Sequence, residues 1–291
     1  MNKIIFKGAA TALITPFKQG KTDFSALQRI IDFQIGKGIA ALVVCGTTGE
    51  CATLCEEEKK ALFEFAVKVS CGRVPIIAGT GSNDTSLSCR LSRAALECGC
   101  DGILCVTPYY NKASELGIYE HYLRIKESAA SLPMILYNVP SRTGVDVPVS
   151  ALKRLGDDGI IQGIKEASGN ISKVADIVRA IPTLDVYSGN DDQILPILAL
   201  GGKGVISVIS NALPEKAQKI CELYFSSKTS AALEAQLECL PLIRLMFEDV
   251  NPIPIKHLMH LLGFCENEYR LPLTPPDEKL KKKLEKACEC L

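Results

Sequence analysis

The chain has 291 residues, of which 47% are hydrophobic, and its 33 basic and 33 acidic side chains give a formal net charge of zero. This length is enough for a large domain, and the balanced charge excludes the strong positive field with which proteins bind nucleic acid or anionic membranes. The first residues hold no apolar segment long enough for a signal peptide, and no later run has the length of a membrane span. We therefore expect a cytoplasmic protein with no nucleic-acid or membrane partner.

The 13 cysteines raise the question of a metal site or of disulfides, but their spacing favours neither. There is no C-x-x-C pair, and none of the three histidines, His121, His257 and His260, stands beside a cysteine. Most of the cysteines lie in apolar runs, where a free thiol behaves as a small hydrophobe. We expect reduced thiols in a reducing compartment and no metal. A thiol metal site is the alternative, and a metal assay of purified protein tests it.

Short apolar runs rich in β-branched residues alternate with helical patterns from the start of the chain to residue 210. The eight runs predicted as strands are 9–15, 41–45, 74–79, 102–107, 134–139, 160–168, 184–189 and 204–210. Strands that alternate with helices pair in parallel through right-handed crossovers. Eight such units favour an α/β fold that closes into a (β/α)8 TIM barrel.

Capping signals mark the starts of the first two predicted helices. Asp23 is placed to cap a helix whose apolar stripe includes Leu27 and Ile30. Thr53 with Glu56 has the spacing of a capping box for the next helix.

The pattern changes near residue 213, after which no further β-branched run appears. The rest of the chain is predicted to be helical, with proline-rich breaks at 251–254 and 271–276. The predicted domains are a catalytic barrel over 1–225 and a small C-terminal α-helical domain over 226–291.

Polar side chains stand at the carboxyl ends of several predicted strands, the face that carries the active site in such barrels. Lys165 is the candidate nucleophile, because an amine in an apolar wall has a lowered pKa and attacks carbonyl groups. Thr47 and Thr48 offer hydroxyl and N–H groups to a carboxylate. Tyr137 suits proton transfer if a nearby cation lowers its pKa, and the Arg142 guanidinium suits a second carboxylate. Together they describe a Schiff-base aldolase acting on a 2-oxo acid.

Each of these residues also has a purely structural interpretation. Taken alone, a lysine at a strand end more often only extends its charge to water, and a threonine pair between glycines is mostly an ordinary turn. An arginine in such a loop is more often merely solvated, and Tyr137 has the alternative of a half-buried packing residue. The neighbouring tyrosines Tyr109 and Tyr110 suit a core or an interface.

Strand alternation assigns the side chains of the candidate site to faces. Lys165 shares a face with Gly163 and Ile161, and Tyr137 shares one with Ile135 and Val139. If these faces point inward, Gly163 leaves a space beneath the lysine.

Six segments, in the same order over essentially the whole chain, resemble the motifs of one enzyme family. They are GTTGE at 46–50, TPYYN at 107–111, YNVPSRTG at 137–144, GIKEASGN at 163–170, SGND at 188–191 and GVISV at 204–208. The chain resembles the dihydrodipicolinate synthase branch of the pyruvate-dependent class I aldolases, a family that also contains N-acetylneuraminate lyase. Arg142 within Ser-Arg-Thr-Gly, together with the double threonine, favours the synthase branch over its lyase relatives.

The resemblance implies a reaction and a set of roles. Pyruvate would condense with L-aspartate 4-semialdehyde to 4-hydroxy-tetrahydrodipicolinate, a step towards diaminopimelate and lysine, through an imine on Lys165 and without a cofactor. Tyr137 would move protons, and Arg142 would hold the semialdehyde carboxylate. The implied catalytic residues are Lys165, Tyr137, Thr47 and Tyr110, and the implied substrate-binding residues are Thr48, Arg142, Ile206 and Gly189.

The resemblance also implies an assembly and a regulatory site. Family members are commonly homotetramers, dimers of dimers, in which the residue aligned with Tyr110 crosses into the neighbouring subunit. Some members bind lysine as a feedback inhibitor, and the aligned positions here are Cys51, Ala52, Glu56, Lys59, Asn83, Leu87 and Tyr109. Lysine-sensitive members carry histidines and an acid where this chain has Glu56, Lys59 and Leu87. We therefore expect weak or absent inhibition by lysine.

Two other functions stay open from the sequence. A sister aldolase would cleave sialic acid or a 2-keto-3-deoxy sugar acid through the same Lys165 imine, and assays with each substrate separate the two. A non-catalytic barrel would bind ligands or other chains, and the presence of Lys165, Tyr137 and Tyr110 together argues against it.

Overall fold

The computed structural model describes residues 5–291, in which eight parallel strands close into one barrel. The strands are β1 (Gly8–Ala12), β4 (Ala41–Val44), β5 (Ile76–Gly79), β6 (Gly102–Val106), β7 (Met134–Asn138), β8 (Gly163–Glu166), β9 (Asp185–Ser188) and β10 (Gly204–Ser207). Each strand pairs with the next in chain order, and β1 pairs with both β4 and β10 to close the ring. The predicted (β/α)8 barrel is confirmed, and each strand is shorter than its apolar run.

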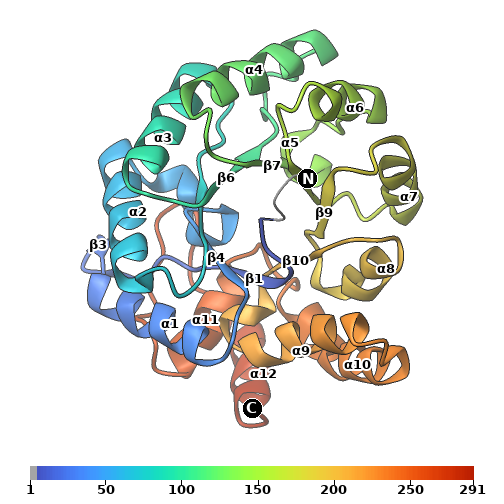
Figure 1. The fold of residues 1–291 in the computed structure, drawn as a ribbon. Coiled ribbons are helices and arrows are strands. Elements are labelled where there is room, and N and C mark those ends of the chain that lie inside the picture. The colour runs from blue at the N-terminus through green and yellow to red at the C-terminus, as the bar shows by residue number, and fades with distance from the viewer. Residues whose placement is uncertain (1–4) are drawn as a thin grey trace.

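Helices surround the barrel, as the end-on view of Figure 1 shows. They are α1 (Phe24–Gly36), α2 (Glu56–Ser70), α3 (Thr85–Glu97), α4 (Glu115–Ser128), α6 (Val149–Asp157), α7 (Ile171–Ala180), α8 (Ile194–Ala199) and α9 (Pro214–Phe225). Short turns follow several strands: η1 (Thr47–Gly49), η2 (Cys51–Thr53), α5 (Pro140–Thr143), η3 (Asp191–Gln193) and η4 (Ile209–Asn211). A small hairpin of β2 (Phe17–Lys18) and β3 (Lys21–Thr22) was not predicted from the sequence.

One of the two predicted helix caps is confirmed and the other is wrong. The Asp23 carboxylate accepts the Ala26 N–H at 2.9 Å and caps α1. Helix α2 begins after Cys55, whose N–H donates to the Glu58 carboxylate at 3.0 Å. Thr53 is instead the last residue of η2, and its hydroxyl donates to the Glu50 carbonyl at 3.1 Å.

The interior of the barrel is filled with side chains beneath the carboxyl ends of the strands. Phe6 stacks on Tyr187 with ring centroids 4.2 Å apart, and the Tyr187 hydroxyl donates to the Phe6 carbonyl at 2.9 Å. A Cβ atom at Gly163 would lie 3.0 Å from the Asp185 carbonyl oxygen and 3.4 Å from the Tyr187 ring. The prediction that Gly163 leaves a space beneath Lys165 is therefore wrong, since Tyr187 occupies that space.

Three helices follow the barrel: α10 (Thr229–Leu245), α11 (Ile253–Leu261) and α12 (Glu278–Cys288). Helix α10 packs against α8 and α9, and α11 packs against α12. The prediction of helix is wrong for residues 262–270, where Gly263, at φ 80°, ends α11, whereas the predicted proline-rich break at 271–276 before α12 is confirmed. The domain division at residues 225 and 226 stays a prediction. Among residues 5–291, no helix is long and apolar enough to cross a membrane.

Candidate active site

A cavity of about 190 Å³ opens at the carboxyl ends of the strands, where the sequence predicted an active site. Six of the predicted site residues line it: Thr47, Thr48, Tyr137, Arg142, Lys165 and Gly189. They come from β7, β8 and the turns after β4, β7 and β9. The barrel thus gathers side chains that are far apart in the sequence around one small polar space.

Lys165 lies on β8, in register with Tyr137 on β7 and Tyr187 on β9. Only 5% of the residue is exposed, and its Nζ lies 4.3 Å from the centroid of the Tyr137 ring. Burial lowers the pKa of the Lys165 amine to about 8; the Arg142 guanidinium adds to this effect, and the Asp191 carboxylate opposes it. A pKa near 8 leaves about one amine in ten neutral at pH 7, which confirms the predicted direction and provides a nucleophile.

Tyr137 is a buried phenol that faces the same cavity. Burial raises its pKa, and the Arg142 guanidinium and a hydrogen bond with the Thr47 side chain only partly offset that rise. The prediction that a nearby cation lowers the pKa is therefore wrong in its net direction. Tyr137 is protonated near neutral pH, so it is equipped to donate a proton or to relay one.

The double threonine forms the 3₁₀ turn η1, which Glu50 ends with a left-handed backbone at φ 53°. The Thr15 hydroxyl donates to the Gly49 carbonyl at 2.7 Å and so holds the turn in place. Thr48 is buried, and its hydroxyl accepts a hydrogen bond from the Asn251 amide at 3.0 Å. The turn therefore presents two hydroxyls to the cavity in a fixed arrangement.

Asn251, just before α11, lines the cavity but was not predicted as a site residue. Its side chain donates to Thr48, and its carbonyl accepts a hydrogen bond from the Arg142 guanidinium at 3.1 Å. One residue of the C-terminal region therefore orients two candidate binding groups. The only sequence signal was the break at Asn251-Pro252, which was interpreted as a helix boundary.

Asp191 on η3 is a second residue that the sequence analysis missed, although it ends the SGND motif. Only 2% of it is exposed, and its Oδ2 accepts the N–H groups of Val208 and Ile209 at 2.9 and 3.0 Å. Burial raises the pKa of this carboxyl, and the hydrogen bonds and the charge of Lys165 oppose the rise. The sequence analysis assigned no chemistry to Asp191 or to Asp192, which follows the motif.

Gly189 is required at the edge of the cavity by close packing. Its N–H donates to the Glu166 carbonyl at 2.8 Å, and a Cβ atom there would lie 2.5 Å from the Cβ of Ala167. A side chain at this position would push apart the ends of β8 and β9. Gly189 therefore fixes the wall beside Lys165.

Tyr110 and Ile206 do not line the cavity of the single chain. Tyr110 is 89% exposed and has a left-handed backbone with φ 71°, which is strained for an aromatic residue. Ile206 is buried inside the barrel, in register with Ala10 on β1.

The positions aligned with the lysine-binding site of some relatives lie over the turn η2, helices α2 and α3 and the segment after β6. Cys51 and Ala52 are in η2, Glu56 and Lys59 are in α2, Asn83 and Leu87 are before and in α3, and Tyr109 follows β6. The Glu56 carboxylate accepts two hydrogen bonds from Arg90, at 2.7 and 3.0 Å. Arg90 therefore already occupies the Glu56 carboxylate as its partner.

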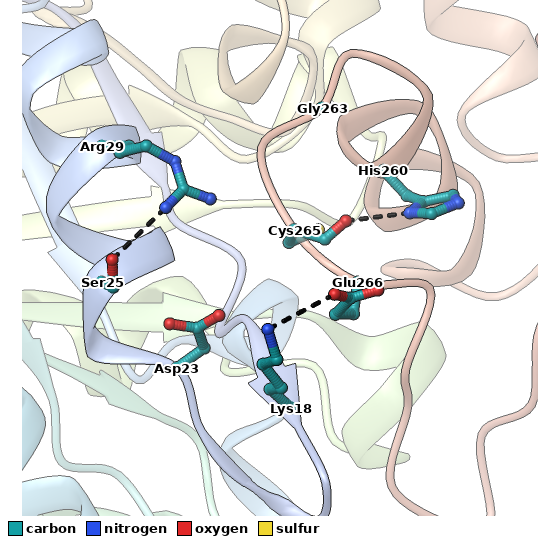
Figure 2. Close-up of a pocket in the computed structure, with 8 residues that line it drawn as sticks. All are labelled: Lys18, Asp23, Ser25, Arg29, His260, Gly263, Cys265 and Glu266. Atoms are coloured by element: carbon teal, nitrogen blue, oxygen red, sulfur yellow. Dashed lines mark hydrogen bonds and ion pairs between the residues drawn. The ribbon is translucent and has the colours of Figure 1, made fainter.

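A second cavity, of about 310 Å³, lies between the start of α1 and the end of α11 and is drawn in Figure 2. Its polar groups pair with one another: Lys18 with Glu266 at 3.8 Å, and the His260 ring with the Cys265 carbonyl at 2.9 Å. Asp23 caps α1 at its edge. These pairings leave few groups free to bind a ligand.

The cysteines show no disulfide in the part of the chain that the structure describes. Nor do residues 5–291 contain a group of three or more histidine, cysteine or acidic side chains able to hold a metal ion. Burial raises the pKa of several of these thiols, among them Cys100 and Cys105, to about 12 each. These cysteines pack as small apolar side chains.

Comparisons with known proteins agree with this geometry. The model of the Dihydrodipicolinate synthetase family matches residues 5–291. A 4-hydroxy-tetrahydrodipicolinate synthase of Alkaliphilus oremlandii is 49% identical over 96% of this chain and 97% of its own length. The crystal structure of dihydrodipicolinate synthase from Aquifex aeolicus superimposes with a TM-score of 0.96 at 40% identity, covering 98% of each chain. The Acinetobacter baumannii enzyme in complex with pyruvate superimposes with a TM-score of 0.94 at 37% identity, covering 97% of this chain and 98% of its own.

Proposed function

The chain belongs to the dihydrodipicolinate synthetase family, and from this premise we propose that it condenses pyruvate with L-aspartate 4-semialdehyde to 4-hydroxy-tetrahydrodipicolinate. It is then a lyase of the class I aldolase type, in the route to diaminopimelate and lysine. The observation that carries the proposal is a buried lysine with a pKa of about 8 in one cavity with a phenol, a guanidinium and a pair of threonines.

The first step is covalent capture of pyruvate by Lys165. The neutral amine attacks the C2 carbonyl, and after uptake of one proton from solvent the carbonyl oxygen leaves as water and a protonated imine remains. We assign the pyruvate carboxylate to Thr47 and Thr48, whose turn faces the cavity beside Lys165. Asn251 fixes the Thr48 hydroxyl and so orients this cradle.

The second step forms the carbon–carbon bond. The protonated imine draws electrons from the pyruvate methyl group, which loses a proton and becomes the nucleophilic carbon of an enamine. This carbon attacks the aldehyde of the second substrate, whose oxygen takes up a proton and becomes a hydroxyl. Tyr137 is the proposed proton carrier, since its phenol lies beside Lys165 and is protonated near neutral pH.

The last step closes the ring and frees the enzyme. The amino group of the bound semialdehyde attacks the imine carbon and displaces Lys165 as a free amine. Arg142 is the proposed partner of the semialdehyde carboxylate, because its guanidinium lines the cavity and its orientation is fixed by the Asn251 carbonyl. The imine itself serves as the electron sink, so the proposed reaction uses no cofactor.

A Tyr137→Phe substitution is expected to lower kcat by about 10² to 10⁴-fold, the usual contribution of one general acid–base group. Phenylalanine keeps the ring against Lys165 and removes only the hydroxyl. Steady-state kinetics should show this loss while pyruvate can still be trapped on Lys165 by borohydride. A variant with wild-type kcat would exclude Tyr137 as the proton carrier.

The proposed reaction is tested directly by substrate choice. Purified protein should consume pyruvate and aspartate semialdehyde in a coupled reductase assay and should fail to cleave sialic acid at a comparable rate. The reverse result would identify a sister aldolase. Absence of both activities, with no pyruvate trapped by borohydride, would leave a non-catalytic barrel.

We propose that the chain assembles as a homotetramer, a dimer of dimers, in the cytoplasm. The exposed and strained Tyr110 supports this, because a partner subunit would bury its ring and hold its backbone. Its hydroxyl would then reach the Thr47 and Tyr137 pair of the neighbouring subunit.

Weak or absent inhibition by lysine stays our expectation, and the engagement of Glu56 by Arg90 supports it.

A further inference from the structure

The proposed steps make no use of Asp191, a buried carboxylate beside the site. Asp191 follows Gly189 and Asn190, which line the active-site cavity, and it binds the N–H of Val208, which also lines the cavity. The carboxylate therefore lies behind the cavity wall, between the ends of β9 and β10.

Asp191 is held in place from several elements. The two N–H groups of Val208 and Ile209 bind its Oδ2, and the Gln236 amide on α10 donates to its main-chain carbonyl at 2.9 Å. Its Oδ1 is buried and makes no direct hydrogen bond among residues 5–291, although the nearby Ser207 side chain lowers the pKa of the carboxyl. No lysine, arginine or histidine within that range forms an ion pair with it. The two N–H groups, the Ser207 side chain and the charge of Lys165 offset only part of the cost of burying this acid, because its pKa stays above the ordinary value.

The charged and titratable groups around this carboxylate are few. Cys221 on α9 and Cys239 on α10 face it, and burial raises the pKa of both thiols, so both are neutral. Lys165 is the cation on which the carboxylate acts: Asp191 raises the pKa of the Lys165 amine, against the effect of burial, and Lys165 lowers the pKa of Asp191. The Lys165 Nζ also lies 4.3 Å from the centroid of the Tyr137 ring, and the Arg142 guanidinium lowers the pKa of Lys165.

We propose that Asp191 is the buried counter-charge of the iminium that Lys165 forms with pyruvate. The inference rests on the proposed function. Asp191 touches no reacting atom and acts through Lys165, so it is a positioning residue. Burial favours the neutral amine that attacks pyruvate, whereas a fixed anion favours the protonated imine that withdraws electrons from the methyl group. The reaction needs the neutral amine first and the protonated imine afterwards. The Asp191 carboxylate stabilises the protonated imine, while burial keeps part of the amine neutral.

The test is the pH profile of kcat/KM for pyruvate, which reports ionisations of the free enzyme. Removing an anion near an amine disfavours the ammonium form. In the Asp191→Asn variant, the rising limb of the profile, which reports loss of the proton from Lys165, should therefore move from about pH 8 to a lower pH. We expect a displacement of about one pH unit and a kcat lowered by at least about tenfold, with a smaller change in KM. A merely structural role would lower kcat without moving this limb.

The matched control is Asp192→Asn, which removes the same charge from the exposed neighbouring residue and should leave the profile unchanged. The amide oxygen introduced by Asp191→Asn can still accept the two N–H groups; if that variant does not fold, Asp191→Ser repeats the measurement with a hydroxyl acceptor. A folded variant whose limb stays at the wild-type pH overturns the inference. Wild-type protein that forms no imine with pyruvate instead overturns the proposed function, so the two failures are distinguishable.

Discussion

Replacing Lys165 with alanine is expected to abolish covalent trapping of pyruvate and to lower kcat/KM by at least about 10³-fold. The reason is that, among residues 5–291, no other lysine lines the cavity to replace its amine as the electron sink. Mass spectrometry after incubation with pyruvate and borohydride should find the reduced adduct on the peptide that contains Lys165 in wild-type protein. The Lys165→Ala protein should carry no adduct.

The matched control is Lys153→Ala, which removes an exposed lysine from α6. It should be trapped and should turn over like wild-type protein. The trapping rate of wild-type protein should rise as the pH passes about 8 and level off above it, because only the neutral amine attacks. An adduct on another lysine in the Lys165→Ala protein would contradict the assignment.

The part of the site predicted from sequence is the part that strand order determines. In a parallel barrel every strand ends on the same face, so polar residues at the ends of apolar runs must converge. Lys165 and Tyr137 were found in this way, and their register on adjacent strands confirms that they meet. Thr47 and Arg142 follow their strands closely enough for the same argument to apply.

The parts that were missed depend on contacts between segments far apart in the chain. Asn251 reaches Thr48 across 203 residues, and its position before a proline carries no sign of that contact. Asp191 was overlooked because its partners are main-chain N–H groups, which any sequence provides. The error over Gly163 has a similar origin, since strand alternation gives a direction and cannot say which neighbouring side chain fills the space.

The pKa of Tyr137 shows a different limit. Sequence supplied the cation, Arg142, but gave no measure of how deeply the phenol is buried. Burial outweighs the cation, and the pKa rises. The direction of a pKa shift depends on the balance of opposing effects, and only the folded chain sets that balance.

A buried ion pair connects the candidate site with the C-terminal region. The Lys256 amine on α11 lies 2.5 Å from the Glu50 carboxylate, and their side chains are 0% and 1% exposed. Glu50 also accepts the Arg270 N–H at 3.1 Å, and the Lys256 amine lies 4.1 Å from the centroid of the Phe17 ring. Since Glu50 ends the turn that carries Thr47 and Thr48, this pair holds the carboxylate cradle against α11.

A Lys256→Met substitution is expected to lower the free energy of unfolding by about 3 to 5 kcal/mol, because it leaves the Glu50 charge buried and unpaired. Urea unfolding at a fixed protein concentration measures the loss. The double variant Glu50→Gln with Lys256→Met removes both charges and keeps an oxygen acceptor for the Arg270 N–H, so it should recover most of the lost stability.

The exposed pair of Lys153 and Asp157 provides the comparison, since Lys153→Met breaks an ion pair in water and should change stability by about 0 to 1 kcal/mol. If the double variant were no more stable than Lys256→Met, the loss would come from packing around α11 and not from the unpaired charge. If the charge is the cause, Lys256→Met should also weaken pyruvate binding, because an unpaired Glu50 would draw water into the turn that bears Thr47 and Thr48. The double variant should restore that binding together with the stability.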